Sequence, residues 1–170
     1  MTIRQIVTLP DPILRRKARP VNHFDADLQT LVDDMIETMR AAPGVGLAAP
    51  QVGVSERIIV VEYVEDEEDE AAPKKLYVMV NPEIKEFSTE TEDGIEGCLS
   101  VPGLQGDVER SWAVTVKGQT RRGQPMKVKA KGWMARIFQH EIDHLNGVVF
   151  TDRATKVWKP QPEQPPLDNV

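Results

Sequence analysis

The segment from Trp133 to about Asn146 contains no glycine or proline and is long enough to form a helix. It includes the sequence HEIDH, which places His140 and His144 four residues apart. Because side chains at positions i and i+4 of a helix point the same way, both imidazoles can bind one metal ion. In helical projection the two histidines border an apolar stripe made of Met134, Ile137, Phe138, Ile142 and Leu145, and they lie away from Arg136, Gln139, Asp143 and Asn146. We therefore expect the rest of the chain to pack around this helix.

Glu141 follows the first histidine and, in the same projection, is turned too far to be an ideal ligand. It is well placed to accept a proton from water bound to the metal. The alternative is that one histidine caps a turn, the other packs in the core, and the motif arose by chance. Ordinary residue frequencies give such a chance occurrence in about one percent or less of chains of this length. The motif therefore favours a catalytic metal site.

A catalytic zinc-type site usually has three protein ligands and leaves a fourth position for water, so a third ligand has to be found. The position that would complete the longer protease motif HExxHxxGxxH is Phe150, which cannot bind a metal, and Glu163 lies in a proline-rich segment. The upstream candidates are His23, the only other histidine, and Cys98, the only cysteine. A lone cysteine is often a small buried apolar residue, but the HEIDH motif favours Cys98, whereas His23 fits a helix start or the surface.

The remaining pattern predicts one further helix and several strands. The N-terminal segment, broken by Pro10, Pro12 and Pro20, is expected to be an extended arm. A helix is predicted from the N-cap Asp25 to about Ala41, followed by GVGLAAPQVG as a glycine-rich, non-helical loop. Strands are predicted at 57–64, 76–81, 84–91, 107–110, 113–119 and 126–130, with the acidic stretch 65–75 as a solvated loop.

These elements predict an α+β fold, in which mostly antiparallel sheets pack around a central helix carrying HEIDH, with an additional N-terminal helix. A chain of 170 residues with 40% hydrophobic residues suits a single core. We expect residues 1–158 to form a single catalytic domain. Residues 159–170 are expected to form a proline-rich tail that need not be ordered.

Composition excludes several classes of protein. The net charge is −6, and much of it lies in the run Glu65 to Glu70, while lysine and arginine are scattered and aromatic residues are only 5%. Direct binding of nucleic acid is therefore not expected. One cysteine rules out an intramolecular disulfide and suits a reducing compartment. No segment approaches the roughly 20 apolar residues of a membrane span, and the N-terminus has no signal-peptide core. We expect a cytoplasmic protein that does not bind membranes.

Three motifs, taken together, resemble the peptide deformylase family. They are GVGLAAPQ (Gly44 to Gln51), EGCLS (Glu96 to Ser100) and HEIDHL (His140 to Leu145), in this order. The similarity extends from about Ile6 to Arg153 and holds at every functional position of the three motifs. The resemblance implies one divalent metal ion held by Cys98, His140 and His144. Family members typically use Fe²⁺ in the cell, and the ligand set also suits Zn²⁺, Ni²⁺ or Co²⁺.

The resemblance also implies the reaction, which is removal of the formyl group from the N-terminal N-formylmethionine of newly made polypeptides with release of formate. Glu141 would take a proton from water activated by the metal and pass it to the leaving amine. The side-chain amide of Gln51 and the backbone N–H of Leu99 would stabilise the oxyanion. Without the resemblance, Gln51 would be interpreted as a loop amide bonded to its own backbone.

Candidate substrate contacts come from the same motifs. Gly44 and Gly46 allow another backbone to approach closely, which suits a peptide paired as an added strand, although a helix-ending turn would use the same glycines. Gly97, directly before Cys98, is a further candidate. Val45, Trp133 and Ile137 are candidates for the pocket that accepts the methionine side chain, and ordinary core packing would give the same pattern.

Two other functions stay open from the residues alone. A metallopeptidase that cuts internal peptide bonds is disfavoured by the missing downstream ligand. A non-catalytic peptide-binding module with a structural metal is disfavoured because no fourth protein ligand lies near the motifs. Transient association with the ribosome remains to be tested. Some members of the family end in a helix through which a ribosome contact would be made, whereas this chain ends in prolines.

Overall fold

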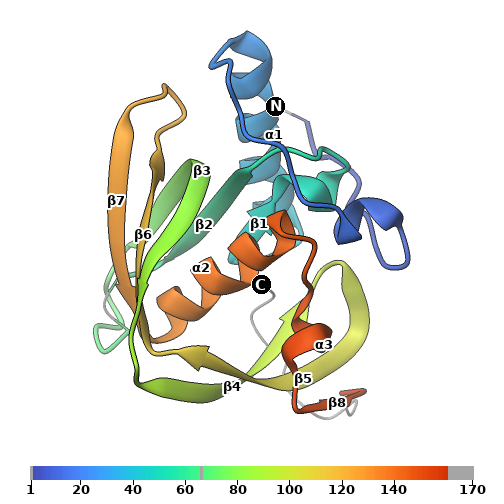
Figure 1. Cartoon of the computed structure of the whole chain (residues 1–170), viewed down its shortest axis with the longest axis vertical. Coiled ribbons are helices and arrows are strands. Elements are labelled where there is room, and N and C mark those ends of the chain that lie inside the picture. Colours follow the sequence, from blue (N-terminus) through green and yellow to red (C-terminus); the bar gives the residue numbers. More distant parts are fainter. Residues whose placement is uncertain (1, 66, 161–170) are drawn as a thin grey trace.

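The computed structural model describes residues 2–65 and 67–160 (Figure 1). The helices are α1 (Ala26–Ala41), α2 (Gly132–Leu145), the short α3 (Phe150–Arg153) and the 3₁₀ turns η1 (Pro12–Arg15) and η2 (Ala49–Val52). The strands are β1 (Gly46–Ala48), β2 (Ile58–Val64), β3 (Lys74–Phe87), β4 (Thr91–Cys98), β5 (Val101–Ser111), β6 (Ala113–Gln119), β7 (Pro125–Lys131) and β8 (Lys156–Trp158). No helix in these ranges is long and apolar enough to cross a lipid bilayer.

The strands form two antiparallel sheets. One has the order β1-β2-β3-β6-β7 and the other the order β4-β5-β8. Helix α2 contacts strands of both sheets and lies at the centre of the molecule, while α1 packs on the other face of the larger sheet (Figure 1). The predicted fold, with antiparallel sheets around the helix that carries HEIDH and an additional N-terminal helix, is confirmed.

The unbroken apolar run of β2 follows from burial on both faces of the sheet. Ile59 and Val61 point into the core around α2, whereas Ile58 and Val60 point into the core beneath α1. Successive side chains of a strand alternate between faces, so a strand covered on both sides needs apolar residues at every position. Each such side chain contributes about 1.5–3 kcal/mol when it is fully buried. The larger sheet is therefore a rigid support for both helices.

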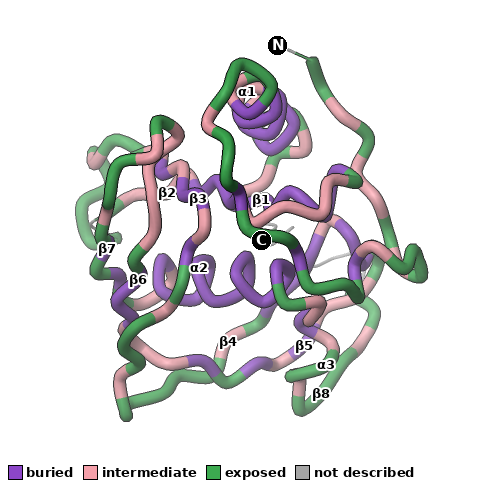
Figure 2. Tube along the Cα trace, turned by 45° about the horizontal axis from the view of Figure 1, so that its top comes forward, coloured by how far each residue is buried: buried purple, intermediate pink, exposed green. Residues whose placement is uncertain are grey.

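Helix α2 is buried from Met134 to its last residue and is held at both ends. Every residue from Met134 to Leu145 is buried, as Figure 2 shows. At the start of the helix, the N-cap Lys131 makes no side-chain cap, and Glu67 Oε1 of the acidic β2–β3 loop accepts a hydrogen bond from Trp133 N at 3.2 Å. At its end, Leu145 O accepts hydrogen bonds from Ala18 N (2.8 Å) and Arg57 Nη1 (2.9 Å). Segments distant in sequence thus fix the position of the helix.

Several predicted elements differ from those observed. The segment predicted as the loop GVGLAAPQVG forms β1 and η2, because residues 46–48 pair with β2. The strand predicted at 76–81 and the first part of the one predicted at 84–91 form one strand, β3, which bulges at Asn81, where φ is 52°, and ends at Phe87. The strand predicted at 107–110 is the longer β5, and β4, α3 and β8 were not predicted. The acidic loop is solvated, as predicted, at each described position from 65 to 70. The predicted tail falls outside the described residues beyond position 160.

Candidate metal centre

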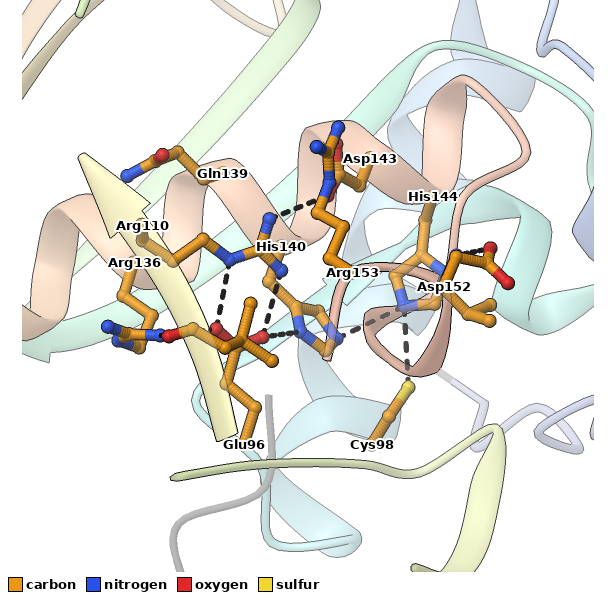
Figure 3. Close-up of polar contacts among 12 residues, drawn as sticks. Glu96, Cys98, Arg110, Arg136, Gln139, His140, Asp143, His144, Asp152 and Arg153 are labelled. Carbon is orange, nitrogen blue, oxygen red and sulfur yellow. Dashed lines mark hydrogen bonds and ion pairs between the residues drawn. The ribbon is translucent and has the colours of Figure 1, made fainter. Parts of the chain in front are cut away.

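Cys98, His140 and His144 converge in the interior of the protein. Cys98 is the last residue of β4, and both histidines lie on α2. One donor atom from each residue lies within 4.8 Å of the other two, and all three residues are buried. The Nε2 atoms of the histidines are 3.2 Å apart, and Cys98 Sγ is 3.4 Å from His144 Nε2 (Figure 3). His23, the other upstream candidate, is exposed near the start of α1 and takes no part in this cluster.

The donors fit a divalent metal ion. His140 Nδ1 is 2.8 Å from Glu96 Oε1. Because an ionised carboxylate can only accept, Nδ1 carries the hydrogen and the Nε2 lone pair faces the sulfur and the second imidazole. Three electron-pair donors facing one point repel each other unless a cation lies between them. A thiolate with two imidazoles suits Zn²⁺, Fe²⁺, Co²⁺ or Ni²⁺, and in catalytic sites three protein ligands leave a position for water.

The surroundings of the cluster favour a positive charge at His140. Burial lowers the pKa of His140, but the neighbouring Cys98 and Glu96 outweigh burial and raise it to about 10. Burial and the nearby His140 hold the pKa of His144 well below its usual value. Cys98 and Glu96 therefore stabilise a positive charge at His140 Nε2, whether a proton or the metal ion that would replace it, next to the neutral imidazole of His144.

Glu96 lies within a buried group of charges. Its side chain is 0% exposed and accepts hydrogen bonds from Arg110 Nε (2.9 Å), Arg110 Nη2 (2.9 Å) and Arg136 Nη1 (2.7 Å). Burial opposes ionisation of Glu96, but the hydrogen bonds and charges of Arg110 and His140 outweigh it and hold the pKa of Glu96 well below its usual range. Glu96 therefore stays ionised and fixes the ring orientation of His140.

Glu141 has the properties of a group that exchanges protons. Its carboxylate is buried against Gly46 of β1, and neither oxygen has a hydrogen-bond partner among the described residues. Burial raises the pKa of Glu141 to about 7. A general base works best when its pKa is close to the operating pH, and an unpaired buried carboxylate is available for a ligand or a water molecule.

Gln51 and Leu99 flank the cluster. Gln51 Nε2 is 3.7 Å from Cys98 Sγ and 3.1 Å from Ser100 Oγ, while Gln51 Oε1 accepts a hydrogen bond from Ala48 N at 3.0 Å. The bond to Ala48 is the local backbone interaction considered as the alternative for this residue, and it turns the amide N–H groups toward the cluster. Leu99 follows Cys98 in the turn between β4 and β5.

The predicted substrate contacts lie on several elements of the fold. Gly44 N donates to Met39 O at 2.7 Å, so this glycine does close the end of α1. Gly46 is in β1, an edge strand of the larger sheet, and Gly97 is buried in β4, an edge strand of the smaller one. Val45 and Ile137 belong to one core cluster, and the partly buried Trp133 packs against it.

The charged partners of Glu96 were not among the predicted site residues. Arg110 and Arg136 are distant from Glu96 in sequence, as is Asp143, the second partner of Arg110, and no spacing rule connects them. On a helical projection of α2, Arg136 and Asp143 have the pattern of a solvated face. The only sequence signal for Glu96 is its place in the EGCLS motif, two residues before Cys98.

Comparison with known proteins gives consistent matches over almost the whole chain. A sequence model of the polypeptide deformylase family matches residues 3–159. The peptide deformylase of Natranaerobius thermophilus is 48% identical over 159 residues, which are 94% of this chain and 97% of that protein. A crystal structure of a peptide deformylase from Legionella pneumophila has 46% identity and a TM-score of 0.81, covering 91% of this chain and 87% of its own. A Met-Ala-Ser bound class I type b peptide deformylase from Acinetobacter baumannii has 43% identity and a TM-score of 0.82, covering 89% of this chain and 98% of its own. The chain belongs to the polypeptide deformylase family.

Proposed function

We propose that this protein removes the formyl group from the N-terminal N-formylmethionine of newly made polypeptides, with Cys98, His140 and His144 as the metal ligands and residues 1–158 as the catalytic domain. The relatives are peptide deformylases, which are metal-dependent hydrolases. The observation that carries the assignment of residues is the buried convergence of these three donors on the helix and strand next to Glu141, whose carboxylate lacks a partner among the described residues.

Each group of the site has a separate role in the proposed amide hydrolysis. A bound divalent ion would lower the pKa of a water molecule and polarise the formyl oxygen. Glu141 accepts a proton from the attacking water and donates it to the departing nitrogen, so the C–N bond breaks and formate and a free amine result. The Gln51 amide and the backbone N–H of Leu99 donate hydrogen bonds to the formyl oxygen as it gains negative charge. These donors are held in place before the reaction, so they need little reorganisation.

The peptide substrate would bind along the edges of the two sheets. The Acinetobacter baumannii relative has been crystallised with Met-Ala-Ser, a tripeptide that begins with methionine. β1 and β4 are edge strands, so an extended peptide can pair with backbone at Gly44, Gly46 and Gly97. Val45, Trp133 and Ile137 would contact the methionine side chain, which is apolar and suits the core cluster they share.

The metal in the cell is proposed to be Fe²⁺, with Zn²⁺, Ni²⁺ or Co²⁺ as substitutes that the same donors accept. An iron–thiolate centre should lose activity in air, because both the metal and the sulfur oxidise. Metal analysis after anaerobic purification tests this assignment. Because the substrates are newly made polypeptides, we propose that the reaction takes place in the cytoplasm. Co-sedimentation with ribosomes tests whether the protein associates with them transiently.

The deciding experiment uses anaerobically purified, iron-loaded protein with formyl-Met-Ala-Ser and, in parallel, with Met-Ala-Ser. Formate and peptide fragments are both measured. Formate from the first peptide without cleavage of either chain supports deformylation. Internal cleavage would identify a metallopeptidase, and the absence of both products would refute the proposal.

A further inference from the structure

The buried charges around Glu96 continue through α2 to the other side of the helix. Arg110 Nη1 donates to Asp143 Oδ2 at 2.6 Å while its Nε and Nη2 bind Glu96. Asp143 in turn accepts from Arg153 Nε (2.6 Å to Oδ2) and Nη2 (3.0 Å to Oδ1). Figure 3 shows the whole series, which runs from Arg153 through Asp143, Arg110 and Glu96 to His140. Charges of opposite sign alternate along it, so every link is attractive.

The links differ in exposure. Glu96 and Arg110 are buried, whereas the side chain of Arg153 is 50% exposed. Arg153 belongs to α3 and lines a cleft of about 840 Å³ on the face of α2 that carries Gln139, Asp143 and Asn146 rather than the two histidines. The series therefore joins a solvent-accessible arginine on one side of α2 to a metal ligand on the other.

The geometry makes this series stiff. Arg153 holds both oxygens of Asp143, and Arg110 holds both oxygens of Glu96, so each carboxylate is fixed in rotation as well as in position. Without Arg153, Asp143 would keep Arg110 as its buried partner and would be free to turn around that contact. Arg110 would then bind two carboxylates of which only one is fixed, and Glu96 would orient the His140 ring less sharply.

We propose that Arg153 is a positioning residue for the metal ligand His140, acting through Asp143, Arg110 and Glu96. The inference rests on the metal-ligand roles proposed above but not on the formyl substrate. Mutation of a direct partner of a metal-bound histidine usually changes metal affinity by about 10- to 100-fold. Arg153 is three links beyond Glu96, the direct partner of His140, so its mutation should have a smaller effect, about three- to tenfold.

The test measures Co²⁺ binding by competition with a chelator, together with the visible absorption of the Co²⁺ protein, which reports ligand geometry. Arg153→Ala should weaken Co²⁺ binding about three- to tenfold and shift the absorption bands. Arg15→Ala is the matched control, because Arg15 pairs with Asp152 on the same short helix without touching Asp143. It should leave both readouts unchanged. Arg153→Lys keeps the charge but not the two-point contact with Asp143, so it should recover only part of the affinity.

The series also predicts non-additivity. In an Asp143→Asn background, Arg153→Ala should cause little further loss of Co²⁺ affinity, because the ion pairs that join Arg153 to Arg110 through the Asp143 carboxylate are already lost. The proposal is overturned if Arg153→Ala stays within twofold of the wild type, if Arg15→Ala causes an equal loss, or if the losses of Asp143→Asn and Arg153→Ala multiply. Should Arg153→Ala not fold, Arg153→Gln replaces it in each comparison. Failure of the wild-type chain to bind Co²⁺ would instead refute the metal centre itself.

Discussion

A methyl group added at Gly46 would occupy space that the carboxylate of Glu141 now fills. An ideal Cβ at Gly46 would lie 2.5 Å from Glu141 Oε2 and 3.0 Å from its Cδ and Cγ. Real Cβ atoms do not approach other atoms within 3.0 Å, so one of the two residues must move. β1 is paired to β2 through Gly46 and Val61, and its backbone cannot easily retreat. The carboxylate of Glu141 should therefore shift, by about 1 Å if ordinary van der Waals distance is restored.

This displacement gives the size of the expected effect. A misplacement of about 1 Å in a reacting group can reduce the rate about 10²-fold, which corresponds to about 2.7 kcal/mol of transition-state stabilisation. Adding a methyl group to a packed interior costs about 1–3 kcal/mol of folding free energy, which a domain of ordinary stability tolerates. Gly46→Ala should therefore fold and bind metal but turn over formyl-Met-Ala-Ser about a hundredfold more slowly.

The assay compares kcat/KM for formate release, metal content and thermal unfolding. Gly123→Ala serves as the control, because Gly123 lies in the turn between β6 and β7 and the three atoms nearest to an added Cβ all belong to Phe24, at 3.3–3.5 Å. With φ at +85°, this substitution should cost about 1–2 kcal/mol of stability and leave kcat/KM unchanged. Wild-type kcat/KM in Gly46→Ala, with metal content unchanged, would refute the view that the position of Glu141 limits the reaction.

Glu141→Ala should leave the metal bound and lower turnover about 10²- to 10⁴-fold; retained activity would exclude Glu141 as the base. Cys98→Ser should weaken metal binding, and an unchanged metal content would make Cys98 an ordinary core residue. Phe138 is fully buried and makes an edge contact with Tyr77, with ring centroids 5.6 Å apart, so Phe138→Ala should lower the free energy of unfolding by about 3–5 kcal/mol. Urea unfolding measures this change, and a loss below about 1 kcal/mol would contradict it. Arg40 hydrogen-bonds to Glu62 and lowers its pKa below 4.5, so the pair adds stability above that pH and loses it as the pH falls through the lowered pKa. Relative to Glu62→Gln, the wild type should be more stable by under about 1 kcal/mol at neutral pH, and a difference that persisted unchanged at about pH 2 would contradict this account.

The elements that could be predicted from the sequence are those whose residues satisfy a local rule. α1 follows from its N-cap Asp25, which accepts from Leu28 N, and from apolar residues at helical spacing. β6 follows from an apolar run bounded by turns, and its predicted limits, 113–119, are those observed. β4 has no such pattern, because four of its eight residues are exposed and it is held by backbone pairing with β5. Pairing between distant segments leaves little trace in a single sequence.

The candidate site shows the same division. The two histidines are brought together by helical spacing, and elimination leaves few candidates for the third donor. Their supporting charges could not be predicted in this way. Arg110 lies on a strand and binds Glu96 and Asp143 only because the smaller sheet covers the polar face of α2. A polar helical face usually indicates solvent, and here it indicates buried ion pairs.

The burial of α2 from Met134 to Leu145 has a consequence for how the enzyme can adapt to different peptides. Amide hydrogens from Met134 to Leu145, where every residue is buried, should exchange with deuterated water only through openings of high free energy. The backbone that carries His140, Glu141 and His144 should thus be among the slowest-exchanging parts of the chain. Adjustment to the side chains that follow the first methionine must then come from edge strands and exposed turns, which open at lower free energy. The reacting groups should thus lie on a segment that opens only at high free energy, and the variable part of the substrate should meet segments that open more readily.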